Sequence, residues 1–110
     1  MEEFLNILEE NIIILDDNFN FKFCNDKFLN EVDINTEEVE KIILNTSNKE
    51  ELIRHFKNNN TYSGILKSYY KDKYIKLHSK VVKHINENKV IYYVVVDKIG
   101  KSKFEVYKGK

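Results

Sequence analysis

The chain has 110 residues, of which 42% are hydrophobic and 33% are charged. These values are typical of one globular domain and exclude a disordered segment. No apolar run approaches the roughly 20 residues that a membrane-spanning helix needs. The start of the chain, Met1-Glu2-Glu3, lacks the basic residues of a secretion signal, so we expect a cytoplasmic protein without a membrane partner. The single cysteine, Cys24, excludes an internal disulfide.

The net charge is zero, but the charges are separated along the chain. Residues 1–50 carry 13 acidic and 4 basic side chains, whereas residues 51–110 carry 5 acidic and 14 basic ones. The balance is therefore −9 in the first half and +9 in the second. Two interpretations stay open: a solvated surface whose halves attract each other, or a basic face that meets an acidic partner or a nucleic acid.

The first part of the chain predicts a short helix and then a β-hairpin. In Glu2–Glu9 the apolar side chains recur at helical spacing, which indicates an amphipathic helix. The β-branched run Ile12–Leu15 predicts a strand. Asp16-Asp17-Asn18 supplies turn residues, and the alternating segment Asn20–Cys24 predicts the second strand of the hairpin.

Three short helices are predicted next. The first covers Asp26–Val32. The second begins with a capping box at Asn35, with a Glu three residues on, and runs to about Leu44. The third repeats that signature at Ser47 and runs to about Lys57.

The remaining sequence predicts a sheet of three further strands, Thr61–Tyr70, Lys73–Ile85 and Lys89–Lys98. Residues 99–110 are expected to form a C-terminal tail or a truncated linker to an output domain. The strands Ile12–Leu15 and Val90–Val96 are apolar at every position or nearly so. A sheet with water on one side should alternate, so we expect both faces of these strands to be covered.

Five segments carry a family resemblance. They are Ile12–Asp16, Phe23–Leu29 with its Asn-Asp-Lys-Phe helix start, Asn35–Val39, Tyr69–Lys73 and Val94–Asp97. Their order and spacing resemble the PAS domain family of sensory modules, over about residues 4–98. The family often has Gly in the first hairpin and after this first helix, where Asp17-Asn18 and Asp33 stand here. Asn and Asp tolerate the left-handed backbone that such positions need.

The resemblance implies an α+β fold. We expect a five-stranded antiparallel sheet with short helices on one face and an N-terminal helix, in a sensory domain over residues 1–98. It also implies a signalling module of a bacterial two-component system, which binds a small ligand or dimerises and regulates an output domain such as a histidine kinase. The homodimer would form through the N-terminal helix and the outer sheet face. A ligand-free interaction module is the alternative.

The resemblance further implies a small cavity under the helices. The expected lining residues are Phe28, Ile42, Ile53, Phe56, Ile65, Leu77, Tyr93 and Val95. The sequence leaves the ligand or cofactor open. His55 lies off the apolar stripe of its helix, which favours a boundary histidine over a heme ligand.

No catalytic or metal-binding motif is present, so we expect no enzyme and no metal site. The sequence lacks G-x-S-x-G, a phosphate-binding glycine loop and H-E-x-x-H. Tyrosines lie among lysines in the last three predicted strands, and RNA-binding sheets stack bases on such aromatic residues. The order of elements differs from those sheets, so nucleic-acid binding is the less favoured alternative.

Overall fold

The computed structural model describes residues 9–70 and 73–103. The helix expected over Glu2–Glu9 lies outside the described residues, apart from Glu9. The elements found are β1 (Asn11–Leu15), β2 (Phe21–Cys24), α2 (Asp26–Val32), α3 (Thr36–Leu44), α4 (Lys49–His55), β3 (Thr61–Tyr70), β4 (Lys73–Asn86) and β5 (Lys89–Lys103). The strands form one sheet in the order β2-β1-β5-β4-β3, with antiparallel neighbours throughout. The predicted five-stranded antiparallel α+β architecture is confirmed.

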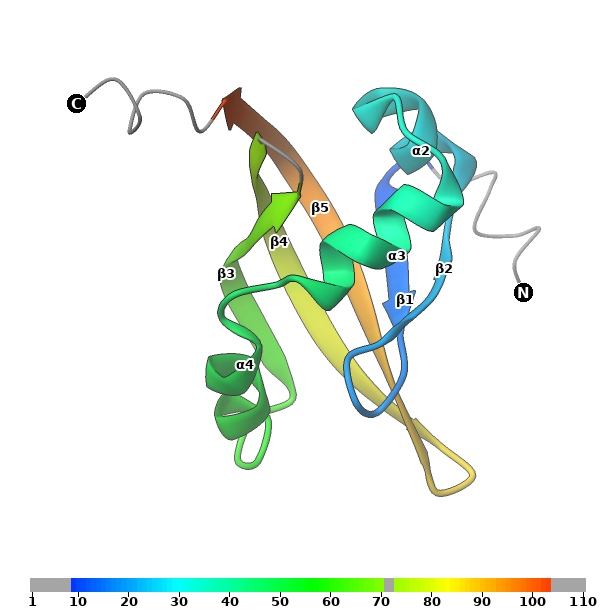
Figure 1. Cartoon of the computed structure of the whole chain (residues 1–110). Coiled ribbons are helices and arrows are strands. Elements are labelled where there is room, and N and C mark those ends of the chain that lie inside the picture. Colours follow the sequence, from blue (N-terminus) through cyan, green and yellow to red (C-terminus); the bar gives the residue numbers. More distant parts are fainter. Residues whose placement is uncertain (1–8, 71–72, 104–110) are drawn as a thin grey trace.

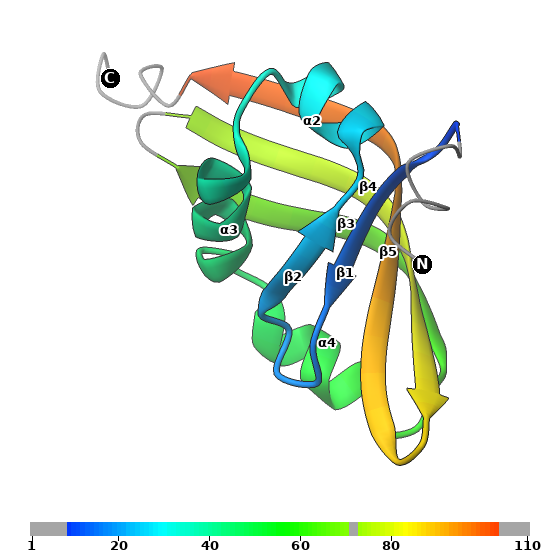
Figure 2. The ribbon, with the colours of Figure 1, turned by 90° about the vertical axis from the view of Figure 1, so that its right-hand side faces the viewer.

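The helices pack on one face of the sheet (Figure 1, Figure 2). Their buried apolar side chains are Phe28, Val32, Val39, Ile42, Ile43 and Leu52. These side chains join those of the inner sheet face in one core. Among the described residues, no helix is long and apolar enough to cross a membrane.

Left-handed residues end one helix and shape two turns, of which the β4–β5 turn contains Glu87 and Asn88. Asp33, at the end of α2, has φ 57° and ψ 48°, and its backbone N–H donates to the carbonyl of Leu29 at 2.9 Å. Asp33 therefore adopts the left-handed backbone for which the family often has Gly at this position. The first hairpin differs from the expectation, because its left-handed residue is Phe19, with φ 63°, and neither Asp17 nor Asn18.

Helix α4 differs from its prediction at both ends. It starts after Asn48 and ends at His55, short of the expected Lys57. The prediction of a capping box at Ser47 is wrong, because Ser47 forms hydrogen bonds with strand β3 and does not cap the helix. Its N–H and its hydroxyl both donate to the carbonyl of Lys67 in β3, at 2.7 and 3.2 Å.

Two further residues of the segment before β3 form hydrogen bonds with carbonyl groups on the free edge of this strand. The side-chain amide of Asn48 donates to the carbonyl of Ile65 at 2.9 Å. His55 Nε2 lies 2.6 Å from the carbonyl oxygen of Thr61. Backbone groups that an edge strand leaves unpaired are thus satisfied by the preceding segment of the chain.

The last strand is longer than predicted, because β5 continues past Lys98 to Lys103. The described part of the expected tail is therefore paired with β4. A β-bulge leaves Asp97 as an extra residue in β5. One added residue reverses the alternation of side chains, so Val96 and Ile99 both pack against the core.

The sheet carries apolar side chains on both faces, as the composition of the two central strands predicts. Ile13 and Leu15 of β1 face the helices. On the opposite side lies a second cluster, here called the outer apolar cluster: Ile12, Ile14, Phe23, Ile91 and Tyr93. The members of this cluster come from β1, β2 and β5, which are adjacent in the sheet.

Asn25 joins the sheet to the helix layer. This residue is fully buried and caps the N-terminus of α2. Its Oδ1 accepts the backbone N–H of Ile12 at 3.1 Å and that of Phe28 at 3.2 Å. Its Nδ2 donates to the carbonyl of Glu10 at 2.7 Å. One side chain thereby fixes the start of β1 against the start of α2.

We predict that Asn25→Ala lowers the free energy of unfolding by about 2–4 kcal/mol, because a cap is lost and buried backbone groups are left unpaired. Asn35→Ala is the matched control. Asn35 also caps a helix, accepting from the N–H of Glu38 at 2.9 Å, but it is exposed and ties no strand. That variant should lose about 1 kcal/mol. If urea denaturation gives both variants the same loss of unfolding free energy, the hydrogen bonds of Asn25 do not stabilise the contact between the sheet and the helix layer.

Candidate functional site

Four of the eight predicted pocket residues lie in the core between the helices and the sheet. They are Phe28, Ile42, Phe56 and Leu77. Each exposes 4% of its surface or less. The structure therefore brings together the residues expected from α2, α3, β4 and the end of α4.

Three others are on the wrong side of the sheet for that pocket. Tyr93 belongs to the outer apolar cluster, and Val95 pairs with Ile12 of the same cluster. In β3 it is Leu66 that faces the core, so its neighbour Ile65 faces outward. The prediction that these three residues line the space under the helices is therefore wrong. Where adjacent strand residues are both apolar, alternation does not fix which of them turns inward.

The remaining predicted residue, Ile53, is also not in the interior. Its side chain is 43% exposed on α4. Leu52 and Phe56 point into the core, and Ile53 falls beside their stripe. It lines a surface groove with Asp17 and Lys57.

In the part of the chain that the structure describes, side chains nearly fill the space under α3 and α4. A hollow under α3 and α4 has a volume of about 10 Å³ and is lined by Leu15, Phe19, Ile43, Thr46, Lys49, Leu52 and Leu66. That is room for about one water molecule. Sites for small molecules typically measure about 300–1,000 Å³, so this hollow does not hold a ligand as it stands.

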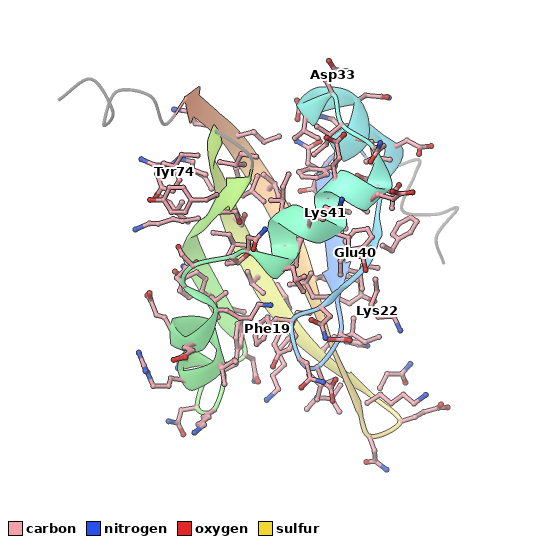
Figure 3. All side chains as sticks on the ribbon, in the orientation of Figure 1. Phe19, Lys22, Asp33, Glu40, Lys41 and Tyr74 are labelled. Carbon is pink, nitrogen blue, oxygen red and sulfur yellow. The ribbon has the colours of Figure 1, made fainter. Side chains whose placement is uncertain are left out.

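Three aromatic rings close the core beside this hollow, where the turn between β1 and β2 meets α4. Figure 3 labels Phe19 at this position. Its ring stacks on that of Tyr92, with centroids 4.2 Å apart and planes at 20°. Phe56 contacts both rings, at 6.1 Å from Phe19 and 4.9 Å from Tyr92. The sequence pattern does not single out Phe19 or Tyr92; the available signal is an aromatic residue in an otherwise polar turn.

The turn holds Phe19 in a backbone conformation that bulky residues rarely adopt. Asp16 Oδ1 accepts the backbone N–H groups of Asn18 and Asn20, each at 2.9 Å, and the Asp16 carbonyl accepts that of Phe19 at 3.0 Å. A left-handed backbone costs a residue with a side chain roughly 1–2 kcal/mol. Burial of the ring, which is 2% exposed, offsets this cost.

His55 has the contacts of a structural residue. Its ring meets those of Phe56 and Tyr62 edge to face, with centroids 5.3 and 5.2 Å apart. Its Nε2 is engaged by the Thr61 carbonyl. Within residues 9–70 and 73–103, no three His, Cys, Asp or Glu side chains are grouped so that they could hold a metal ion.

The outer face over β3 and β4 differs from the outer apolar cluster, because it is basic and aromatic. Lys67 pairs with Lys76 across the strands, and Tyr69 pairs with Tyr74. The two tyrosine rings stack on each other, with centroids 4.6 Å apart, and the Nζ of Lys76 lies 5.3 Å from the centre of the Tyr74 ring. One face of each tyrosine ring is therefore covered by the other ring. Nucleic-acid binding by this face remains the less favoured prediction.

Burial raises the pKa of three groups in or near the core. The pKa of the Cys24 thiol rises to about 11, first because it is buried and then because of the Asp26 carboxylate. Burial also raises the pKa of Tyr62, with Glu51 adding to the rise and a hydrogen bond from Asn48 opposing it. Burial and then Asp17 raise the pKa of Tyr92. These groups stay protonated near neutral pH, so the thiol is a packing residue and not a nucleophile.

Comparison with known proteins identifies the fold of the chain but no family to which it belongs. No family model matches the chain. No curated protein matches it either. Among solved structures, the chain is similar to one described as a PAS domain from a two-component sensor histidine kinase, with a TM-score of 0.62 and 12% identity over 92% of each chain. The chain therefore has a PAS-like fold, as its sequence resemblance predicted.

We predict that Phe19→Gly is more stable than Phe19→Ala, which reverses the usual order of these two residues. Phe19→Ala removes a buried ring and should cost about 3–5 kcal/mol. Phe19→Gly removes the same ring but relieves the left-handed strain, so it should be about 1 kcal/mol more stable than the Ala variant. At Phe21 in β2, whose φ is not left-handed, Ala should be the more stable of the two. Urea denaturation of the four variants measures both orders, and the same order at both sites would contradict the strain.

We predict that the free energy of unfolding falls as the pH rises from 9 through 11. The thiol of Cys24 ionises near 9.0 when exposed but near 11 when folded, so its stabilising effect is complete below pH 9 and is lost above. Tyr62 and Tyr92 contribute to the same fall. Cys24→Ala should show a smaller fall in urea denaturation between these pH values. An identical pH dependence in the variant would show that the thiol is not shielded.

Proposed function

We propose that this chain is a non-enzymatic PAS-type signalling module, which dimerises and regulates an attached or partner output domain such as a histidine kinase. The PAS-like fold supports the proposal, as does the sensor-kinase origin of the similar structure. The outer apolar cluster is the observation that carries it. Apolar clusters on the outside of a monomer typically mark an interaction site.

The outer apolar cluster suits a second copy of the chain. Ile91, Tyr93 and Phe23 are half-buried on the face opposite the described helices. An apolar cluster can pair with the same cluster of a second copy across a two-fold axis. The predicted N-terminal helix would add to this interface.

The same strands that form the outer cluster also reach the core. In β5, Tyr92 stacks on Phe19 inside, while the next residue, Tyr93, packs outside with the apolar cluster. A shift of β5 therefore moves side chains on both faces together. This coupling supplies a route by which a change in the core would alter the dimer, and so the output.

The filled interior favours the ligand-free alternative for the state seen here. A ligand of ordinary size would have to enlarge the hollow of about 10 Å³ by moving α3 or α4 away from the sheet. Such opening is a population shift whose cost reduces the apparent affinity. Native mass spectrometry of the purified chain reports bound ligand and dimer in one measurement.

We expect the chain to sediment as a dimer at high concentration and Ile91→Lys to sediment as a monomer. A charge placed in an apolar interface is left without a partner and raises the dissociation constant at least roughly 100-fold. Urea denaturation of the variant confirms that the monomer remains folded.

The matched control is Ile85→Lys. Ile85 is 60% exposed near the tip of the β4–β5 hairpin, outside the cluster. This variant should remain dimeric. A monomeric parent chain, or equal effects of the two substitutions, would rule out the proposed interface.

A further inference from the structure

A cleft rich in carboxylates is lined by residues of α2 and β5 and by residues at the start of β1. Figure 1 shows α2 beside the end of the sheet where β1 begins. One part of the cleft is lined by Glu9, Glu10, Asn11, Lys27, Glu31, Val95, Val96 and Asp97. The adjoining part is lined by Glu31, Asp97, Lys98 and Ile99. Four carboxylates thus face two lysines, and the cleft has an excess of negative charge. It is separate from the hollow under α3 and α4 and from the outer apolar cluster.

Asn11 supplies an unused hydrogen-bond acceptor in this cleft. Its side chain is only 5% exposed. Its Nδ2 donates to Glu31 Oε2 and, at 3.5 Å, to the carbonyl of Val96. Its Oδ1 is buried with no hydrogen-bond partner. Because a buried polar atom without a partner costs about 1–3 kcal/mol, the cleft gains from any group that brings an N–H donor to this oxygen.

Contacts within the chain position Glu31, and the strand geometry positions Asp97. Glu31 is held from two sides, by the Asn11 amide and by Lys27, whose Nζ lies 3.5 Å from Oε1. Asp97 is the extra residue of the β-bulge, which turns its exposed side chain out of the regular alternation. Bulges of this kind often re-aim a side chain next to a functional site.

We propose that this cleft binds a small organic cation that carries N–H donors, a primary alkylammonium or an alkylguanidinium. The carboxylates provide the opposite charge, and the Asn11 oxygen takes one donor at the buried end. Charge-assisted hydrogen bonds of this kind are among the strongest in proteins. A metal ion fits less well, because among the described residues no three acidic, His or Cys side chains are suitably grouped. The inference does not depend on the proposed dimer or on an output domain.

The test follows the backbone amide signals of the full chain by NMR at constant ionic strength. The probes are n-propylguanidinium, n-butylammonium and tetramethylammonium, which has the charge but no N–H. The first two should shift the signals of Asn11, Glu31 and Asp97, with tetramethylammonium at least about tenfold weaker. A short peptide with one internal Arg separates two sources of the cation. Tighter binding of the peptide indicates a partner's side chain, and tighter binding of free propylguanidinium indicates a small molecule.

Three variants locate the site. Glu31→Gln and Asp97→Asn keep the shape of the side chain and remove one charge each, so each should weaken propylguanidinium binding by about 3- to 10-fold. Asn11→Leu removes the unused acceptor and should reduce the preference over tetramethylammonium, because the carboxylates still accept N–H groups. If that variant fails to fold, the two charge variants still decide the question.

Glu87→Gln is the matched control, because Glu87 is exposed in the β4–β5 turn, at the far end of the sheet from α2 (Figure 1). It should leave the affinity unchanged. Equal affinity for all three cations, no binding at millimolar concentration, or equal weakening by Glu87→Gln and Glu31→Gln would overturn the proposal.

Discussion

The pairing of β1 with β5 is the constraint on which the whole sheet depends. It joins Asn11 to Val96, 85 positions apart, and it unites the N-terminal hairpin with the β3–β4–β5 meander. Every other strand pair joins neighbours in the sequence. Closing so long a loop costs conformational entropy, which the apolar side chains on both faces of the two strands offset. The helices and the outer cluster are arranged around this pair.

Local signals in the sequence predict local structure well. The capping box at Asn35 forms with both of its hydrogen bonds, and Asp33 takes the left-handed conformation expected of it. The order of the elements also follows from the pattern of apolar runs and turns, whereas the five-stranded antiparallel sheet is implied by the family resemblance. The helix caps are decided within a few residues of the chain.

Features that depend on distant contacts are not visible in the pattern. Tyr93 and Val95 are as apolar as the residues beside them, so only the stacking of Tyr92 on Phe19 decides which side faces the core. Ser47 lies in a sequence pattern typical of a helix start, but its hydroxyl donates a hydrogen bond to a carbonyl of β3. The bulge at Asp97, which carries β5 beyond the predicted end, is fixed by the register with β4. Half of the predicted pocket was misplaced for these reasons.

The hydrogen bonds made by Ser47, Asn48 and His55 along the edge of β3 limit how this protein can bind a partner. An exposed strand edge is a template to which a foreign strand can add by backbone hydrogen bonds. Here Ser47, Asn48 and His55 occupy acceptors of that edge, so a strand arriving from this side finds them already engaged. Strand-by-strand growth into a continuous ribbon is blocked on that flank. A partner that meets this flank is therefore recognised through side chains and not through strand addition.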